Sequence, residues 1–164
     1  MAKPKLEIFF SYAHADEALR NQLEKHLGSL KRQKRIITWY DRNIPPGTEW
    51  ASEIDAHLKT AHIILLLVSS DFIDSEYCWS VELRKAIKRH NAGEACVIPI
   101  IVRPVNWKKT PFAKLQALPT DGKPISTWSN IDEALLNVVE GIQKAVDLQR
   151  EKISTSASEP GTTC

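Results

Sequence analysis

Apolar and polar residues alternate along the chain in blocks that predict a series of strands and helices. The clearest block is Ile63–Val68, an unbroken apolar run that is too short to span a membrane and indicates a strand buried on both faces. Runs rich in apolar or β-branched residues predict further strands at residues 6–10, 35–40 and 96–102. Residues 123–126 predict a short fifth strand.

The segments between these strands carry apolar residues at helical spacing. Asp16 is a good N-cap for the first helix, whose buried stripe should consist of Leu19, Leu23, Leu27 and Leu30. The later stripes are Trp50, Ile54 and Leu58 on a helix capped by Thr48; Trp79, Leu83, Ala86 and Ile87 on a helix after Ser75; and Ile131, Leu135, Val138, Ile142 and Val146 on a helix capped by Ser129 or Asn130.

Alternating strands and helices predict an α/β fold. Because the middle strands are apolar on both faces, we expect a flavodoxin-like, open, parallel five-stranded sheet of order 2-1-3-4-5, with helices on both faces. Ligands bind such sheets at the carboxyl ends of the strands where the order reverses, here between strands 1 and 3. This brings Ser11, Tyr12 and Glu82 near one crevice. Residues 1–150 form the predicted domain, and residues 151–164 a disordered tail or linker.

Composition narrows the classes of function. The chain is 43% hydrophobic and 26% charged with a net charge of +2, so neither a nucleic-acid nor a membrane partner is indicated. No transmembrane run or secretory signal is visible, so we expect a cytoplasmic protein. The three cysteines and five histidines form no metal-ligand spacing, so we expect no metal site, and Cys96 should be a buried core thiol.

Three common ligand-binding classes with this kind of sheet lack their required residues. A response-regulator receiver needs paired acidic residues after strand 1, where this chain has Ser-Tyr-Ala-His. A flavodoxin needs a Ser/Thr-rich phosphate loop there, and a nucleotide-binding glycine motif is missing because the chain contains no Gly-x-Gly. Ser11 and Ser70 have no recognisable histidine–acid partners, so a serine hydrolase is disfavoured.

Four segments, in order and at domain spacing, resemble Toll/interleukin-1 receptor (TIR) domains. Residues 8–16 resemble the first conserved box of that family, and residues 41–47 the second. Residues 63–70, followed by Cys-Trp-Ser-Val-Glu-Leu, are similar to the third strand and the helix after it. Residues 98–104 and 115–119 are similar to the distal part of bacterial TIR domains. The resemblance covers about residues 5–148 and implies a bacterial role in immune signalling or anti-phage defence.

The resemblance implies one of two functions. Many TIR domains cleave NAD+ between nicotinamide and ribose, giving ADP-ribose or a cyclised isomer, with NAD+ as substrate and no other cofactor. Others are non-catalytic adaptors that act by TIR–TIR interaction, and self-association also completes catalytic sites. The family's catalytic glutamate matches Glu82; catalytic relatives often carry Trp four residues earlier, where this chain has Cys78 with Trp79 beside it.

The chemistry explains why one glutamate is enough. Nicotinamide leaves NAD+ as a neutral molecule, so no general acid is needed, and an ionised carboxylate can stabilise the oxocarbenium-like transition state. The substrate site implied around Glu82 consists of Phe10, Ser11, Tyr12, Asp41, Arg42, Gly47, Trp50, Cys78 and Trp79. The implied self-association loop consists of Asn43, Ile44, Pro45 and Pro46.

These residues also have ordinary structural explanations. A helical glutamate is usually solvated or paired with a cation one turn away, and Lys85 is available to Glu82. Other structural roles are a turn pair, Asp41 with Arg42, and core positions on two helices, Trp50 and Trp79.

Overall fold

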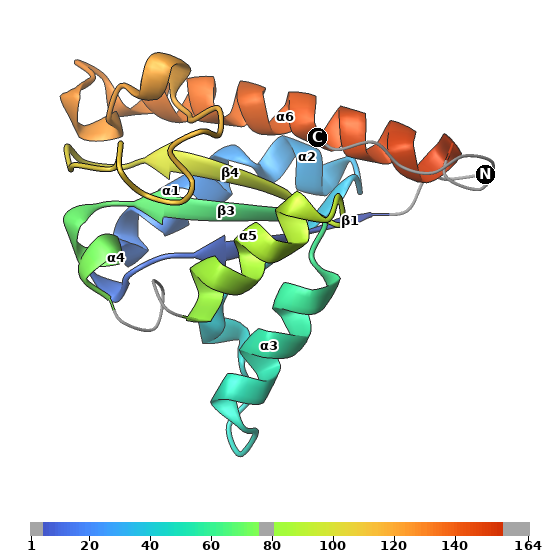
Figure 1. The fold of residues 1–164 in the computed structure, drawn as a ribbon. Helices are drawn as coiled ribbons and strands as arrows, with labels where there is room; N and C mark the ends of the chain where they lie inside the picture. Colours follow the sequence, from blue (N-terminus) through green and yellow to red (C-terminus); the bar gives the residue numbers. More distant parts are fainter. Residues whose placement is uncertain (1–4, 76–80, 156–164) are drawn as a thin grey trace.

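Four parallel strands form the centre of the protein, seen here in a computed structural model that describes residues 5–75 and 81–155 (Figure 1). They pair in the order β2-β1-β3-β4, so the order reverses between β1 and β3, as the sequence predicts. The strands are β1 (Leu6–Ser11), β2 (Ile36–Trp39), β3 (Ile63–Val68) and β4 (Cys96–Ile101). All six residues of β3 are buried, as expected for a strand with neighbours on both sides and helices on both faces.

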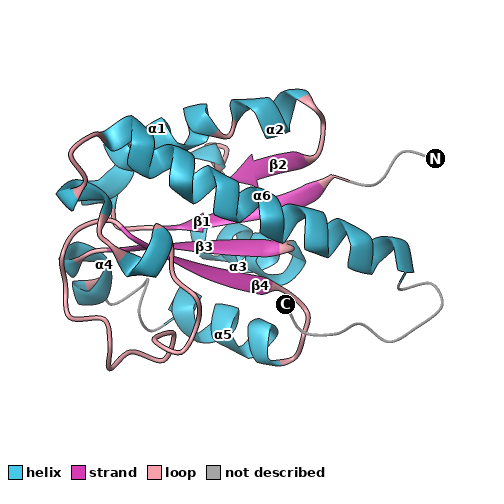
Figure 2. Cartoon of the chain, turned by 90° about the horizontal axis from the view of Figure 1, so that it is seen from above, coloured by secondary structure: helices cyan, strands magenta, loops and turns pink. Residues whose placement is uncertain are grey.

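Helices cover both faces of the sheet (Figure 2). On one face lie α1 (Glu17–His26), α2 (Gly28–Arg32) and α6 (Ile131–Thr155); on the other lie α3 (Trp50–Thr60) and α5 (Leu83–Asn91); and α4 (Ser70–Asp74) directly follows β3. The strand period of two divides the core accordingly. Phe10 and Leu65 pack in the cluster shared with α1 and α6, whereas Phe9 and Ile64 pack in the cluster shared with α3 and α5. The α/β architecture with two helical layers is therefore confirmed.

The predicted fifth strand is wrong for the described part of the chain. Ile125–Thr127 form a 3-10 turn instead of a strand. The edge of β4 is met only by an isolated bridge between Ile100 and Leu118. There the amide of Ile101 donates to the carbonyl of Leu118 (2.8 Å), and the amide of Leu118 donates to the carbonyl of Pro99 (2.9 Å).

The outer edge of β4 explains why no regular ladder forms. Pro99 has no N–H to donate. The amide of Val97 donates instead to Nδ1 of His90 at 3.1 Å, a bond from a side chain of α5. A strand laid along this edge would find few donors, so the four-stranded sheet ends here.

The helices begin close to the residues predicted from the sequence, but some capping interactions differ from the prediction. Asp16 is the N-cap of α1 but makes no capping hydrogen bond with its side chain, and Glu49, not Thr48, is the N-cap of α3. Asn130 does cap α6, accepting from the amides of Asp132 (2.8 Å) and Glu133 (3.2 Å). The α6 helix continues to Thr155, past the expected boundary at residue 150, and residues 156–164 lie outside the described part.

Candidate functional site

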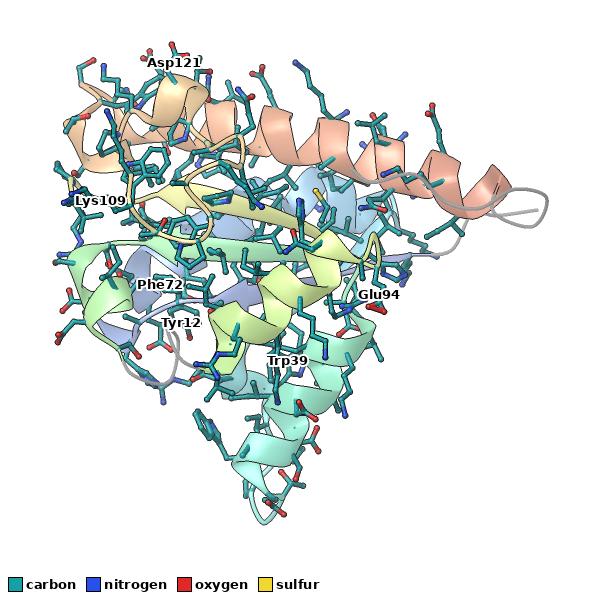
Figure 3. All side chains as sticks on the ribbon, in the orientation of Figure 1. Tyr12, Trp39, Phe72, Glu94, Lys109 and Asp121 are labelled. Atoms are coloured by element: carbon teal, nitrogen blue, oxygen red, sulfur yellow. The ribbon has the colours of Figure 1, made fainter. Side chains whose placement is uncertain are left out.

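A pocket of about 290 Å³ lies at the carboxyl ends of β1 and β3, where the strand order reverses. The loop after β1, the turn after β2 and the start of the segment after β3 contribute to its walls. Figure 3 shows Tyr12, one of its lining residues, at the carboxyl end of β1. The polar and aromatic side chains that line the pocket are Tyr12, His14, Asp41, Trp50, Asp71, Ser75 and Glu82.

Glu82 is a buried carboxylate in this pocket. It lies in a π-helical turn with Val81 immediately before α5, and it is only 7% exposed. Ser11, the last residue of β1, is 1% exposed and donates a hydrogen bond from Oγ to Oε1 of Glu82 at 2.7 Å. Wider π-type turns are common at functional positions, because they shift a side chain out of the regular helical register.

The surroundings of Glu82 favour its neutral form. Burial raises the pKa of Glu82 to about 7, and the negative charge of Asp41 acts in the same direction, while the hydrogen bond from Ser11 opposes them. Near neutral pH the carboxyl is therefore divided between its protonated and ionised forms. A carboxyl with this behaviour in a pocket is a candidate for chemistry.

The ordinary explanation for Glu82, an ion pair with Lys85, does not describe the structure. Lys85 forms its ion pair with Asp55 of α3 instead, and Asp55 also pairs with Lys59 at 3.0 Å. Glu82 points to the sheet end and to Ser11, so it is not a surface charge of α5.

A hydrogen-bonded network joins the loop after β1 to the turn after β2. The hydroxyl of Tyr12 lies within donating distance of Oδ1 of Asp41 (3.0 Å) and Oε1 of Glu17 (3.2 Å). Nε2 of His14 lies 3.3 Å from Oδ2 of Asp41, and Arg42 binds Glu17 through Nε at 2.6 Å. Asp41 thus lines the pocket and is held by two residues of the β1 loop.

The turn after β2 continues into an exposed loop. Gly47 has φ +86°, a conformation that favours glycine, and a Cβ at this position would meet no atom within 4 Å. The loop is braced by the side chain of Asn43, which accepts from the amide of Tyr40 (3.1 Å), and by Thr48, which donates to the carbonyl of Pro45 (2.7 Å). With α3 it projects away from the sheet (Figure 1).

The remaining predicted site residues are placed differently from one another. Trp50 is 43% exposed and lines the pocket, so it is not a core residue of α3. Phe10 is 2% exposed and packs in the core, with the guanidinium of Arg20 4.9 Å from its ring centre, and it is not among the residues that line the pocket. Cys78 and Trp79 lie outside the described residues.

The site predicted from the sequence left out two residues with ionisable side chains that line the pocket, His14 and Asp71. His14 lies in the 3-10 turn after β1 and Asp71 in α4 after β3, so their positions next to the switch-point strands were a usable signal. Within residues 5–75 and 81–155, no group of three or more His, Cys, Asp or Glu side chains is arranged to hold a metal ion, and no helix is long and apolar enough to cross a membrane.

Comparison with known proteins identifies the family. Residues 8–136 match the family model described as "TIR domain". This chain belongs to the TIR domain family. The match begins within β1, includes the residues that line the pocket and ends within α6, so the TIR resemblance expected from the sequence is confirmed.

A relative of this TIR domain comes from a bacterium, which is consistent with the bacterial type expected from the sequence. The uncharacterized protein y4lF of Sinorhizobium fredii (strain NBRC 101917 / NGR234) is 52% identical over 153 residues, which are 93% of this chain and 46% of that protein. The chain thus spans about half the length of this relative.

Solved structures show the same fold. The TIR domain of the Toll-related receptor TRR-2 from Hydra magnipapillata superposes with a TM-score of 0.63 at 19% identity, covering 85% of this chain and 97% of that one. The TIR domains of the activated Roq1 resistosome, which directly recognises the pathogen effector XopQ, give a TM-score of 0.50 at 18% identity, covering 96% and 86%.

Proposed function

We propose that this TIR domain is an NAD+ glycohydrolase with Glu82 as its catalytic residue. The observation that supports this most is the buried Glu82 carboxyl, 7% exposed and hydrogen-bonded to Ser11, in a pocket at the switch point of the sheet. Family membership is consistent with the proposal, since TIR domains include enzymes of this kind as well as adaptors.

The reaction needs one stabilising anion and little else. The bond between C1′ of the ribose and the pyridinium nitrogen breaks, and its electron pair neutralises the ring, so nicotinamide leaves without a proton from the enzyme. Ionised Glu82 then stabilises the positive charge that develops on the ribose ring and binds the ribose hydroxyls. Water adds to C1′ and releases one proton, which gives ADP-ribose; attack by a group of the same substrate would give a cyclised isomer.

The charges of the pocket favour a cationic ring. The carboxylates of Asp41 and Glu82 line it together with His14 and the exposed Trp50, and a third carboxylate, that of Asp71, is paired with Arg103. A carboxylate-rich pocket beside an indole attracts a pyridinium cation through charge and through the face of the aromatic ring. The same charges repel phosphate, so we place only the nicotinamide and its ribose inside.

The pocket size favours the same arrangement and a role for self-association. Its volume of about 290 Å³ is at the small end of ligand sites. The adenosine and diphosphate part of NAD+ would therefore extend beyond it, where a second copy of the chain can complete the site. The Roq1 TIR domains, which belong to an activated assembly, make such association a reasonable expectation here.

A non-catalytic adaptor is the second candidate, and the loop before α3 favours it. Asn43, Pro45, Pro46 and Gly47 are exposed, and the loop projects from the body of the domain with a defined conformation (Figure 1). A surface of this kind suits docking of another TIR domain. In that case Glu82 would have no chemical role.

Release of nicotinamide from NAD+ by the purified domain separates the two candidates. We expect turnover that rises steeply with protein concentration or with a crowding agent, because a second copy completes the site, and we expect Glu82→Ala to abolish it. Glu133→Gln is the matched control, since this exposed glutamate lies on α6 and does not line the pocket. If the domain shows no turnover at high concentration, or the same turnover in Glu82→Ala, the enzyme proposal is wrong and the adaptor remains.

A further inference from the structure

A second cluster of polar groups lies beside the pocket, where the segments that follow β1, β3 and β4 meet. Nη2 of Arg103 donates to Oδ1 of Asp16 (2.9 Å) and to Oδ2 of Asp71 (2.6 Å). Oγ of Ser69 donates to the other oxygen of Asp16 (2.5 Å) and accepts from the amide of Phe72 (3.1 Å). The Asp16 side chain is 4% exposed and Ser69 is fully buried, whereas Arg103 and Asp71 are 39% and 49% exposed, so the cluster runs from the interior to the surface.

The cluster connects two walls of the pocket. Asp71 lines the pocket itself, and the residues immediately before Asp16, Ala13 to Ala15, line the wall that the β1 loop contributes. Arg103 follows β4 by two residues and comes from neither wall. A single terminal nitrogen of Arg103, Nη2, donates both of its N–H groups, one to each wall.

We propose that Arg103 is a positioning residue, which holds the segment after β1 (residues 12–16, here the β1 loop) and the segment after β3 (residues 69–75 with α4, here the β3 loop) at the separation that the substrate pocket requires. The proposal rests on the NAD+ glycohydrolase function for its kinetic consequences, but the positioning itself concerns the two loops alone. Arginine suits the task because its planar guanidinium holds two acceptors in fixed directions, which lysine does not.

Charge contributes as well as geometry. Asp71 is about half exposed and faces the pocket. While Arg103 binds it, its charge is compensated and its side chain is held at the wall. Without Arg103, the Asp71 carboxylate is free to move toward the bound substrate. It would then attract the pyridinium ring away from Glu82 and weaken productive binding of NAD+.

The alternative is that Arg103 forms an ion pair that only stabilises the fold. The variants must distinguish this role from positioning of the two loops. A buried carboxylate such as Asp16 needs a compensating charge, so removal of all charge at residue 103 endangers the fold. Arg103→Lys keeps a cation near Asp16 but loses the fixed two-way donor. Asp71→Asn keeps the buried pair and weakens only the contact with the β3 loop.

The first experiment measures amide hydrogen exchange in the full chain and does not require activity. We expect Arg103→Lys to speed exchange in both loops, residues 12–16 and 69–75. Arg35→Lys is the matched control, because Arg35 forms an ordinary exposed pair with Asp147 (3.0 Å) and should leave both loops unchanged. Unchanged exchange in either loop of Arg103→Lys would overturn the proposal, whatever the protein does to NAD+.

The second experiment uses the kinetics of nicotinamide release. Arg103→Lys should raise KM by about tenfold, because displaced walls bind the substrate poorly. The acidic limb of the pH profile should stay in place, because Asp71 is not among the charges that shift the Glu82 pKa. Arg103→Lys combined with Asp71→Asn should be no worse than Arg103→Lys alone. A lower melting temperature of Arg103→Lys with unchanged KM would overturn the proposal and show that Arg103 only stabilises the fold. If the wild-type protein shows no turnover, the glycohydrolase function is wrong, and the hydrogen-exchange experiment alone decides whether Arg103 positions the two loops.

Discussion

Two hollows in the surface of this TIR domain differ in size and in chemistry. The switch-point pocket has a volume of about 290 Å³, whereas a groove of about 600 Å³ lies between β4, the segment at residues 114–118 and α6. The groove, which we call the β4 groove, has an apolar floor and charged side chains at Lys114, Glu140 and Lys144, all exposed. The smaller pocket contains Glu82, which is almost completely buried.

The difference shows why volume is a poor guide to a reaction site. An exposed charge stays in contact with water, whereas a carboxyl taken out of water loses the solvation of its charged form, which raises its pKa. Glu82 is buried with one hydroxyl donor, Ser11, and next to another carboxylate, Asp41. A fold optimised for stability alone would place an apolar residue there.

The largest expected effect is on nicotinamide release, and it should differ between a glutamate of the switch-point pocket and a glutamate of the β4 groove. Glu82→Gln keeps the shape of the side chain but removes the anion, so nicotinamide release should fall by roughly 100- to 1,000-fold. Glu140→Gln in the β4 groove should release nicotinamide at the wild-type rate. Equal losses in the two variants would mean that the difference in burial has no bearing on catalysis.

Glu82→Gln should lose activity but gain stability at high pH, whereas Glu140→Gln should change neither. Folded Glu82 holds its proton up to about pH 7, whereas a glutamate in the unfolded chain loses it near 4.5. The folded state therefore binds more protons between these values, and wild-type stability falls as pH rises through that window. Glu82→Gln has no charge to bury, so at pH 8 it should be more stable than wild type by about 3 kcal/mol, and close to it near pH 4.

Urea unfolding at the two pH values measures this difference, with Glu140→Gln as the control that should follow wild type at both. A stability difference between Glu82→Gln and wild type that does not change with pH would show that the carboxyl is not desolvated in solution.

A smaller effect is expected from the donor to Glu82. The hydrogen bond from Ser11 favours the ionised carboxylate, so Ser11→Ala should raise the pKa of Glu82. The acidic limb of the profile of kcat/KM against pH, near 7 in wild type, should move to higher pH, with a loss of roughly tenfold on the limb itself. Above the limb the two profiles should converge; a uniform loss at every pH would assign Ser11 another role.

The smallest expected effect on the fold concerns the exposed loop. Valine in place of Gly47 would be strained at φ +86° by about 1–3 kcal/mol, and the exposed loop should relax to another conformation. We expect unchanged thermal unfolding of the domain and weaker self-association by analytical ultracentrifugation. Gly28→Val is the control, since this helical glycine also has open space around its Cβ position but no positive φ. Wild-type association by Gly47→Val would remove the loop from the interface.

The sequence predicted the elements of this fold well because their signals are local. The apolar run Ile63–Val68 required burial on both faces, and the leucine stripe at residues 23–30 required one buried helical face. Prediction failed where a local pattern was weak. Residues 123–126 look like a strand, but the edge of β4 offers Pro99 and an amide already bound to His90.

Individual roles in the site were harder to predict because they depend on contacts across the sheet. Asp16 is suited by sequence to cap α1, yet its carboxylate binds Ser69 and Arg103, residues 53 and 87 positions away. Phe10 and Ser11 are adjacent, but the alternation along β1 sends one into the core and the other to Glu82. Trp50 occupies a position of an apolar stripe and is nevertheless exposed at the pocket.

The sequence by itself determined the parallel α/β order, the switch point between β1 and β3 and the choice of Glu82 as the residue to examine. The first two follow from periodicity and apolar runs, which are properties of short segments, and the choice of Glu82 follows from the resemblance of those segments to TIR domains. Only the tertiary structure decided that Glu82 is buried, that Ser11 and Asp41 act on its pKa in opposite directions, and that Arg103 joins the two loops beside it. Burial and electrostatic coupling depend on the distances between segments far apart in the chain, and folding alone sets those distances.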